Sequence, residues 1–327
     1  MLIYIEKKAK DYEVTKKILS NFSNNQILWI DHYKNIFDKK IGNQILTPAI
    51  IIAKEENPNL LPVPNNYWYP GKSFFFRTSL NCVFDCEYCY LKGNFKTKYP
   101  VIFVNYEDIK NEITNKINEI RNEGYNNQIT LYASNYSDIQ WLDSLSWFNE
   151  NFIPFIEQFE NVLMESRTKS ANIDSILSIN KWIPFNNTEI SFSLNPKEII
   201  SKYEKGTSPL ETRIKAINTL LDKNYKVGLR FLPLLPVNNY EKIYSDFLEK
   251  LKWEINIEKI HSIFIASLIY NQWDFKTMQK KNPNSTLWDF VKQHENWLIK
   301  IPDDIFENFS KIFKQAFPKK EIYYDFV

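Results

Sequence analysis

The sequence predicts an α/β protein centred on an open, partial (β/α)6 barrel, with a small N-terminal α/β extension and a C-terminal cap. Short apolar runs alternate with helical stretches from residue 73 almost to the end, and such alternation demands a parallel sheet with crossover helices. Six repeats fall short of the eight that close a full barrel. Four prolines, at 58, 62, 64 and 70, mark an extended connection before the repeats. We therefore expect three parts, at residues 1–70, 71–270 and 271–327.

The expected elements follow from periodicity and from helix start signals. The clearest helix start is Ser208-Pro209-Leu210-Glu211, where serine, proline and glutamate have the spacing of a capping box. In the N-terminal part we expect strands at 2–5, 27–30 and 47–53, with a helix at 12–22. In the repeats we expect strands at 73–78, 128–133, 161–165, 188–194, 226–232 and 260–267, and helices at 106–122, 141–160, 172–180, 208–223 and 240–251. In the C-terminal part we expect a final helix at 303–317.

The composition excludes several classes of protein. The 327 residues carry 41 Lys and Arg against 39 Asp and Glu, a net charge of +2, so no global field attracts nucleic acid. No apolar run reaches the roughly 18–20 residues that span a bilayer. Charged residues come too early at the N-terminus for a signal peptide. We expect a cytoplasmic protein with no membrane partner.

One short loop holds all three cysteines of the chain, Cys82, Cys86 and Cys89, directly after the first strand of the repeats. Their spacing is CxxxCxxC, and an aromatic residue, Tyr90, follows the last. Three thiolates this close can hold three irons of a 4Fe–4S cluster. The fourth iron has no cysteine left, and a missing protein ligand in a metal site usually means an open position for substrate or cofactor.

The three cysteines have three other interpretations. A disulfide would leave one thiol over, and nothing indicates an oxidising compartment. A structural zinc would need a fourth ligand from His32, His261 or His294, none of which has finger-like spacing. Chance clustering of three buried cysteines is the third alternative. The ligand count and the spacing favour the open cluster.

Polar residues follow the other predicted strands. They lie at 134–138, 166–169 and 193–195. The fifth strand ends in Pro233, after the polar residue Arg230. In a parallel barrel the chemistry takes place at the carboxyl ends of the strands, so these residues should face the cysteines. The alternative is that βα loops are polar in every such protein, whatever its function.

The cysteine motif resembles the signature of radical S-adenosylmethionine (SAM) enzymes, and the whole chain resembles their spore photoproduct lyase family. The cysteine motif alone is typical of the superfamily, whereas the Gly-Thr-Ser-Pro-Leu segment at 206–210 is more specific for this family. The segments that carry the resemblance are 82–90, 136–139, Thr168 and Lys169 with Asp174, 192–195, 204–210 with Arg213, 316–318 and 322–324.

The resemblance implies a radical SAM type of barrel, two cofactors and a set of site residues. A 4Fe–4S cluster would be held by the three cysteines, and S-adenosyl-L-methionine would bind its open iron. Tyr88 and Tyr90 match tyrosines proposed in the family to relay a hydrogen atom back to SAM. A small electron donor such as flavodoxin or ferredoxin would reduce the cluster. Ser137, Lys169 and Ser193 match SAM contacts of the family, and Tyr90, Asn195 and Arg213 are further candidates for cofactor binding.

Two departures from the family's pattern bear on the substrate. The family's lyases carry a cysteine that donates a hydrogen atom to the product radical, and this sequence has Asn135 there, whose amide N–H is a far stronger bond than S–H. The family's lesion-binding hairpin is rich in Arg, Lys and Tyr, but the corresponding stretch at 286–303 has mixed charge, so its attraction for DNA phosphates is weak.

We therefore expect a lyase-like radical SAM enzyme that cleaves SAM reductively to a 5′-deoxyadenosyl radical. The family's own reaction would be thymine-dimer C–C scission in DNA repair, and the charge pattern does not support DNA as a partner. One alternative is an enzyme of this family with a different substrate. A further alternative is a non-enzymatic iron–sulfur or nucleic-acid-binding protein, whose aromatic stretches at 67–69 and 288–297 could stack on bases.

Overall fold

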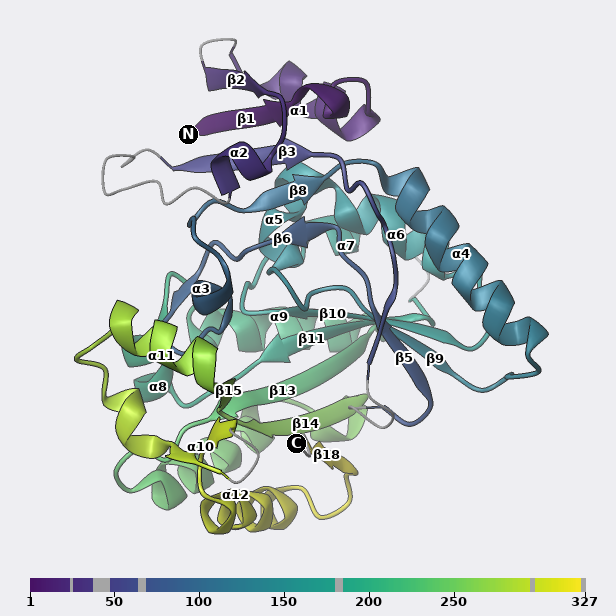
Figure 1. Cartoon of the computed structure of the whole chain (residues 1–327). Helices are drawn as coiled ribbons and strands as arrows, with labels where there is room; N and C mark the ends of the chain where they lie inside the picture. Colours follow the sequence, from purple (N-terminus) through teal and green to yellow (C-terminus); the bar gives the residue numbers. More distant parts are fainter. Residues whose placement is uncertain (24–25, 38–47, 64–68, 180–184, 295–297, 325–327) are drawn as a thin grey trace.

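The computed structural model describes residues 1–23, 26–37, 48–63, 69–179, 185–294 and 298–324 (Figure 1). Its centre is a curled eight-stranded sheet in the order β18-β14-β13-β11-β10-β9-β5-β4, which confirms the partial barrel. All strands are parallel except β4 at one edge, so the carboxyl ends of the others meet at one edge of the sheet. The strands are β4 (Leu61–Pro62), β5 (Lys72–Phe75), β9 (Ile129–Tyr132), β10 (Val162–Thr168), β11 (Thr188–Ser193), β13 (Lys226–Leu234), β14 (Ser262–Ser267) and β18 (Ile322–Tyr324).

Helices connect these strands along the outer face of the sheet. In α4 (Tyr106–Asn122) the buried isoleucines 109, 113, 117 and 120 recur at helical spacing and form the stripe that packs inward. Among the described residues no helix is both long and apolar enough to span a membrane. The other connecting helices are α5 (Ile139–Ser146), α6 (Phe148–Ile156), α7 (Asp174–Ile179), α8 (Lys197–Tyr203), α9 (Leu210–Asp222), α10 (Tyr240–Glu254) and α12 (Asp303–Ala316).

Two local predictions were wrong. The single helix expected at 141–160 is split into α5 and α6, because Trp147 between them has a left-handed backbone with φ 49°. The capping box at 208–211 does not form, and α9 begins at Leu210 with Pro209 as its N-cap. The Ser208 hydroxyl instead accepts a hydrogen bond from the backbone N–H of Ala171, and Glu211 pairs with Lys197. A tertiary contact therefore replaces the local cap.

The N-terminal part forms a second sheet with the order β2-β1-β3-β8-β6. Its strands are β2 (Ile27–Ile30), β1 (Leu2–Glu6), β3 (Ala49–Ala53), β8 (Val101–Phe103) and β6 (Ser79–Leu80), and its helices are α1 (Glu13–Asn21), α2 (Lys34–Phe37) and the 3₁₀ turn η1 (Lys7–Ala9). This sheet takes in β6 and β8 from beyond residue 70, and the three expected domain boundaries stay a prediction. The start of the strand expected at 47–53 lies outside the described residues.

The C-terminal part adds a small three-stranded sheet beside the barrel. It consists of β15 (Ile269–Asn271), β16 (Lys292–Gln293) and β17 (Leu298–Lys300). The helix α11 (Gln272–Lys281) and the 3₁₀ turn η4 (Thr286–Phe290) lie between β15 and β16 in the chain. A further 3₁₀ turn, η3 (Ile257–Lys259), precedes β14 of the main sheet. The two strands β16 and β17 form an antiparallel hairpin. The final helix α12 and strand β18 then return to the edge of the main sheet.

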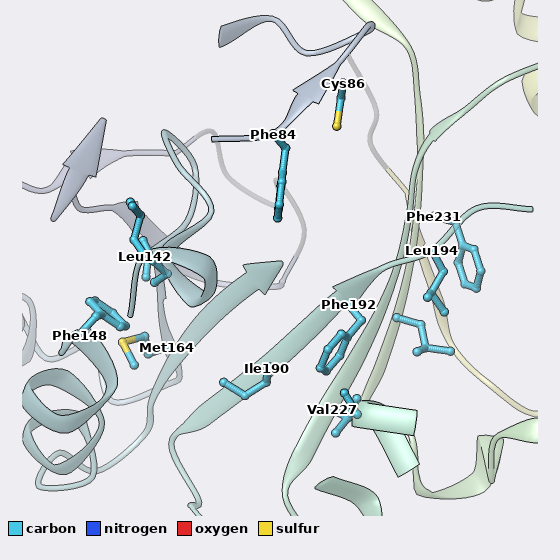
Figure 2. Packing of buried hydrophobic residues seen from close by; sticks show 14 of the residues in the cluster. Phe84, Cys86, Leu142, Phe148, Met164, Ile190, Phe192, Leu194, Val227 and Phe231 are labelled. Carbon is cyan, nitrogen blue, oxygen red and sulfur yellow. The ribbon is translucent and has the colours of Figure 1, made fainter. Parts of the chain in front are cut away.

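The main hydrophobic core lies between the sheet and its helices, and the cysteine loop belongs to it. Figure 2 shows Phe84 and Cys86 of the loop above strands that carry Ile190, Phe192 and Val227. Phe192 and Val227 are completely buried. Because the loop is packed into this core through Phe84, its position is fixed relative to the strand ends.

The inside of the barrel also holds a buried ionic network. Arg230 on β13 donates from Nε to Glu165 Oε1 on β10 at 2.6 Å and from Nη2 to Glu189 Oε1 on β11 at 2.5 Å. His261 Nδ1 contacts the other oxygen of Glu189. Gly228 makes room for this network, since a Cβ there would collide with the Glu189 carboxylate. The network ties three neighbouring strands together.

We predict a loss of stability in acid that depends on Glu189. Burial alone would raise the pKa of Glu189, but Arg230 and His261 outweigh it and hold that pKa well below its ordinary value of 4.5. The ionised carboxylate therefore stabilises the fold above pH 4.5, and this contribution is lost as the pH falls toward the lowered pKa. Urea unfolding at a series of pH values should show a shallower acid dependence for Glu189→Gln. The same dependence as wild type would contradict the prediction, and exposed Glu307→Gln is the control.

Candidate active site

The cysteine loop is held in position next to its first two cysteines, by the Asn81 side chain before Cys82 and by a pair of short strands at Cys86. Asn81, just before Cys82, has a left-handed backbone with φ 65°, and its side chain donates to Thr97 O at 2.8 Å and accepts from Cys82 N at 2.9 Å. The strand β7 (Asp85–Cys86) pairs antiparallel with β12 (Glu204–Lys205), which sets Cys86 opposite Glu204. These contacts fix the positions of Cys82 and Cys86 in the loop.

A cavity of about 250 Å³ opens at the carboxyl ends of the parallel strands, and all three cysteines line it. The expectation that residues after the strands face the cysteines is met at several positions. The lining residues from the strand ends include Ser134, Asn135, Ser137 and Asp138 after β9, Arg167, Thr168 and Lys169 at the end of β10, Ser193 on β11, and Leu232 and Pro233 on β13.

Burial opposes the thiolate form of all three cysteines. It raises the pKa of Cys86 to about 12 and raises the pKa values of Cys82 and Cys89, while the Lys169 ammonium lowers those of Cys86 and Cys89 in part. A bound metal would displace the thiol protons, because thiolate is the ligand form. Lys169 lies beside the cysteines, with its Nζ 5.6 Å from the centre of the Tyr88 ring.

The donor set fits an iron–sulfur cluster better than a single ion. A site for a single ion needs three ligand atoms close together. In the described part of the chain, the only such group of His, Cys, Asp or Glu side chains, with all ligand atoms within 4.8 Å of one another, is Glu6, His32 and Glu56. The three cysteines do not form such a group. No described histidine lines the cysteine pocket, since His261 binds Glu189 and His294 binds Asp303. Three thiols spread around one cavity suit the separate irons of a cluster.

Asp138 fixes the wall that carries Lys169. It is buried, and it accepts hydrogen bonds from Thr168 Oγ1 and Lys169 N, both at 2.7 Å, and from Trp141 N at 3.1 Å as the N-cap of α5. Burial raises the pKa of Asp138, and these donors offset the rise only in part. Next to it the Ser137 hydroxyl is buried in the pocket wall with no hydrogen-bond partner in the described structure. A bound ligand with a polar group could satisfy this hydroxyl.

Asn195 and Arg213 do not reach the cavity. Both are fully buried, and both hold Glu204 from behind the pocket wall. Asn195 Nδ2 donates to Glu204 at 3.1 Å, and Arg213 Nη2 donates to it at 2.8 Å. Arg213 Nη1 also donates to the backbone oxygen of Ser193 at 2.7 Å. Their assignment as cofactor contacts stays a prediction, and their observed contacts are those of supporting residues.

The two tyrosines of the loop have different partners. Tyr88 is buried and its hydroxyl donates to Glu204 at 2.6 Å. Tyr90 is half-buried and its hydroxyl donates to the backbone oxygen of Asn135 at 2.6 Å. The structure thus brings Tyr90 and Asn135 into direct contact at the cavity, while Tyr88 is turned toward Glu204.

Sequence reasoning did not name Glu204 or Asp138 as site residues. Asp138 had a signal, since it follows a strand of the repeats. Glu204 had none beyond the family resemblance, because its pairing with Cys86 joins residues more than a hundred positions apart. Of the aromatic stretches expected to stack on bases, Tyr69 is buried against Glu189, and residues 67, 68 and 297 lie outside the described residues.

The comparisons with known proteins agree on one family. The family model "Spore photoproduct lyase" matches residues 69–297. The spore photoproduct lyase of Clostridium acetobutylicum is 27% identical over 263 residues, covering 76% of this chain and 72% of that protein. The spore photoproduct lyase of Bacillus subtilis is 24% identical over 269 residues, covering 80% of this chain and 75% of that protein.

Solved structures of spore photoproduct lyase share the fold over almost the whole chain. One, a variant with a cysteine replaced by alanine, matches with a TM-score of 0.83 at 18% identity, covering 99% of this chain and 98% of that one. Another, a double variant with bound AdoMet and dinucleoside spore photoproduct, matches with a TM-score of 0.81 at 18% identity and the same coverage. Because the family model matches more than half of the sequence, this chain belongs to the spore photoproduct lyase family of radical SAM proteins.

Proposed function

We propose that this protein is a radical SAM enzyme that binds a 4Fe–4S cluster through Cys82, Cys86 and Cys89 and SAM in the adjoining cavity. The observation that carries the proposal is that all three cysteines line one cavity at the strand ends. When bound, the cluster and SAM supply reductive cleavage of the S–C5′ bond and a 5′-deoxyadenosyl radical. The neighbour with bound AdoMet and membership of the family support this assignment.

The chain's own residues would bind and orient the cofactor. Lys169 places a cation at the cavity, where it would attract the SAM carboxylate, and Ser137 and Ser193 offer hydroxyl groups. Asp138 holds Lys169 by its backbone N–H at 2.7 Å. Leu232, Ala266 and Leu268 form an apolar part of the cavity wall, which would limit the access of water to the reacting centre once the ligands are bound.

The test is anaerobic reconstitution with iron and sulfide, followed by dithionite and SAM, with 5′-deoxyadenosine measured by chromatography. Release of 5′-deoxyadenosine supports the proposal. A cluster that forms but never cleaves SAM would contradict it and favour a non-enzymatic iron–sulfur protein. Salt-dependent retention by DNA without any cluster would favour a nucleic-acid-binding protein.

A different substrate from the family's thymine dimer is the second candidate. The β16–β17 hairpin has mixed charge, because His294 and Lys300 both contact Asp303, at 2.9 and 2.8 Å, and Lys292 is the exposed lysine of these strands with no ion pair among the described residues. In addition, Asn135 stands where we infer the family's hydrogen-donor cysteine. Adding DNA that contains spore photoproduct to the SAM assay separates the two candidates, since only the lyase would convert the dimer to two intact thymines in the strand.

We predict that Asn135→Cys raises thymine formation if the lyase reaction takes place here. A thiol at this position supplies the weak S–H bond that the amide lacks, and the backbone contact of Tyr90 with residue 135 is kept. We expect an increase of about tenfold or more, equivalent to about 1.4 kcal/mol at the quenching step. Thymine yield per SAM cleaved is the measurement, and Asn135→Ser is the control without a thiol. An unchanged yield would place the donor elsewhere, with Tyr90 as the nearest phenol.

A further inference from the structure

A short helix, α3 (Leu91–Asn94), forms the outer side of the cysteine loop. It begins one residue after Tyr90, and Lys92 N donates to Cys89 O at 3.1 Å. The helix α11 packs against α3 (Figure 1). Gly93 permits the close approach, since a Cβ there would lie 3.3 Å from Asp274 Oδ1, and Lys281 Nζ donates to the backbone oxygens of Lys92 and Phe95.

Four exposed lysines lie on α11 and in the segment that follows α3. The side chains of Lys96, Lys98, Lys276 and Lys280 are exposed, and none of the four amines has an ion-pair partner among the residues that the structure describes. Burial lowers the pKa of the Lys281 ammonium, and the charges of Lys92 and Lys98 lower it further, so cations of the two helices lie close together.

Nearby carboxylates do not neutralise these lysines. Asp85 is paired with Lys92 at 2.5 Å, Glu87 with Lys205 at 3.2 Å, and Asp274 is buried at the helix contact. The surface therefore keeps a positive charge although the whole chain carries only +2. We call these residues the α3–α11 surface: Lys96, Lys98, Trp273, Lys276 and Lys280.

An exposed tryptophan lies beside the lysines. Trp273 is 63% exposed, and on α11 it is spaced i, i+3, i+7 with Lys276 and Lys280, which places all three on one face of the helix. A large aromatic side chain surrounded by charged side chains is typical of a protein–protein contact. Lysines around it would steer an acidic partner.

We propose that the α3–α11 surface docks a small acidic flavoprotein electron carrier of the flavodoxin type. This inference rests on the proposed function, which requires an electron at the cysteines. The surface is joined to Cys89 through α3, which begins two residues after Cys89 and whose Lys92 N donates to Cys89 O, whereas the cavity lined by the cysteines is needed for SAM and substrate. One electron leaves the reduced flavin of the carrier and enters the cluster, so the carrier is oxidised by one electron, and no bond in this chain changes.

The test uses Lys276→Glu/Lys280→Glu, with Lys215→Glu/Lys223→Glu as a matched control on exposed lysines at the far side of the barrel. SAM cleavage is measured with reduced flavodoxin and, separately, with dithionite. We expect the flavodoxin-driven rate at low salt to fall about tenfold or more and the dithionite-driven rate to stay unchanged. The second measurement is the affinity of the cluster-free protein for flavodoxin over a series of salt concentrations. In Lys276→Glu/Lys280→Glu this affinity should be about tenfold weaker than in wild type and should lose its salt dependence.

Three outcomes would overturn the proposal. The first is a variant that keeps its flavodoxin affinity. The second is a variant that loses both rates equally, which would place the effect in the site or the fold. Loss of salt-dependent binding to a DNA duplex, with flavodoxin affinity intact, would assign the surface to nucleic acid. If wild type itself fails to cleave SAM with dithionite, the proposed function fails, and the affinity of the cluster-free protein alone decides whether the carrier docks here.

Discussion

Replacing Cys86 with alanine is expected to lower the rate of SAM cleavage by at least ~100-fold. Loss of a residue that only hydrogen-bonds to a metal ligand already lowers metal affinity or activity by about 10–100-fold, and Cys86 would be a ligand itself. Cys86 is one of three thiols at the cavity. Apart from these three cysteines, no described side chain of the loop can supply a sulfur ligand. Its backbone is fixed by the β7–β12 pair, so a neighbouring thiol cannot move into its place. The measurements are iron and sulfide content after anaerobic reconstitution and 5′-deoxyadenosine release with dithionite.

Asp85→Asn is the matched control for this variant. Asp85 adjoins Cys86 in the same strand, but it is exposed and pairs only with Lys92. Its replacement should leave iron content and SAM cleavage close to those of wild type. A Cys86→Ala protein with full cluster content and full activity would show that the three-cysteine assignment is wrong.

The architecture could be predicted because each strand carries its own signal. All six strands of the repeats lie within a few residues of the predicted ranges, since each is an apolar run bounded by polar segments. The split of α5 and α6 had no comparable signal. The sequence there continues a helical pattern, and the break depends on Trp147, whose left-handed conformation is uncommon for a bulky residue.

The candidate site could be predicted where it depends on local spacing or on topology. The three cysteines are close in sequence, and parallel strands bring Ser137, Lys169 and Ser193 to the same edge of the sheet. Contacts between distant side chains carry no such signal. Asn195 follows a strand in the same way as Lys169, yet it is turned behind the wall toward Glu204. Residue type and position predicted a polar strand end, but only packing decides which side it faces.

The buried network around Arg230 gives the largest expected effect on stability. We predict that Arg230→Met lowers the free energy of unfolding by about 3–5 kcal/mol, because it leaves two buried carboxylates, Glu165 and Glu189, without their shared cation. Urea unfolding at pH 7 is the measurement. Arg230→Lys should also be destabilised, since an ammonium cannot reproduce the two separate contacts of the guanidinium.

The matched control removes all three charges together. Glu165→Gln/Glu189→Gln/Arg230→Met removes the three fully buried charges, and Arg167, which pairs with Glu165 at 3.5 Å and is partly exposed, is the remaining cation that loses a carboxylate. This triple variant should therefore recover part of the lost stability. A loss below about 1 kcal/mol for Arg230→Met, the value typical of exposed pairs, would mean that water reaches the barrel interior. A triple variant as unstable as the single one would instead show that the network contributes attraction between the strands. The pair of variants thus separates the cost of an unpaired buried charge from the strength of the ion pairs that join β10, β11 and β13.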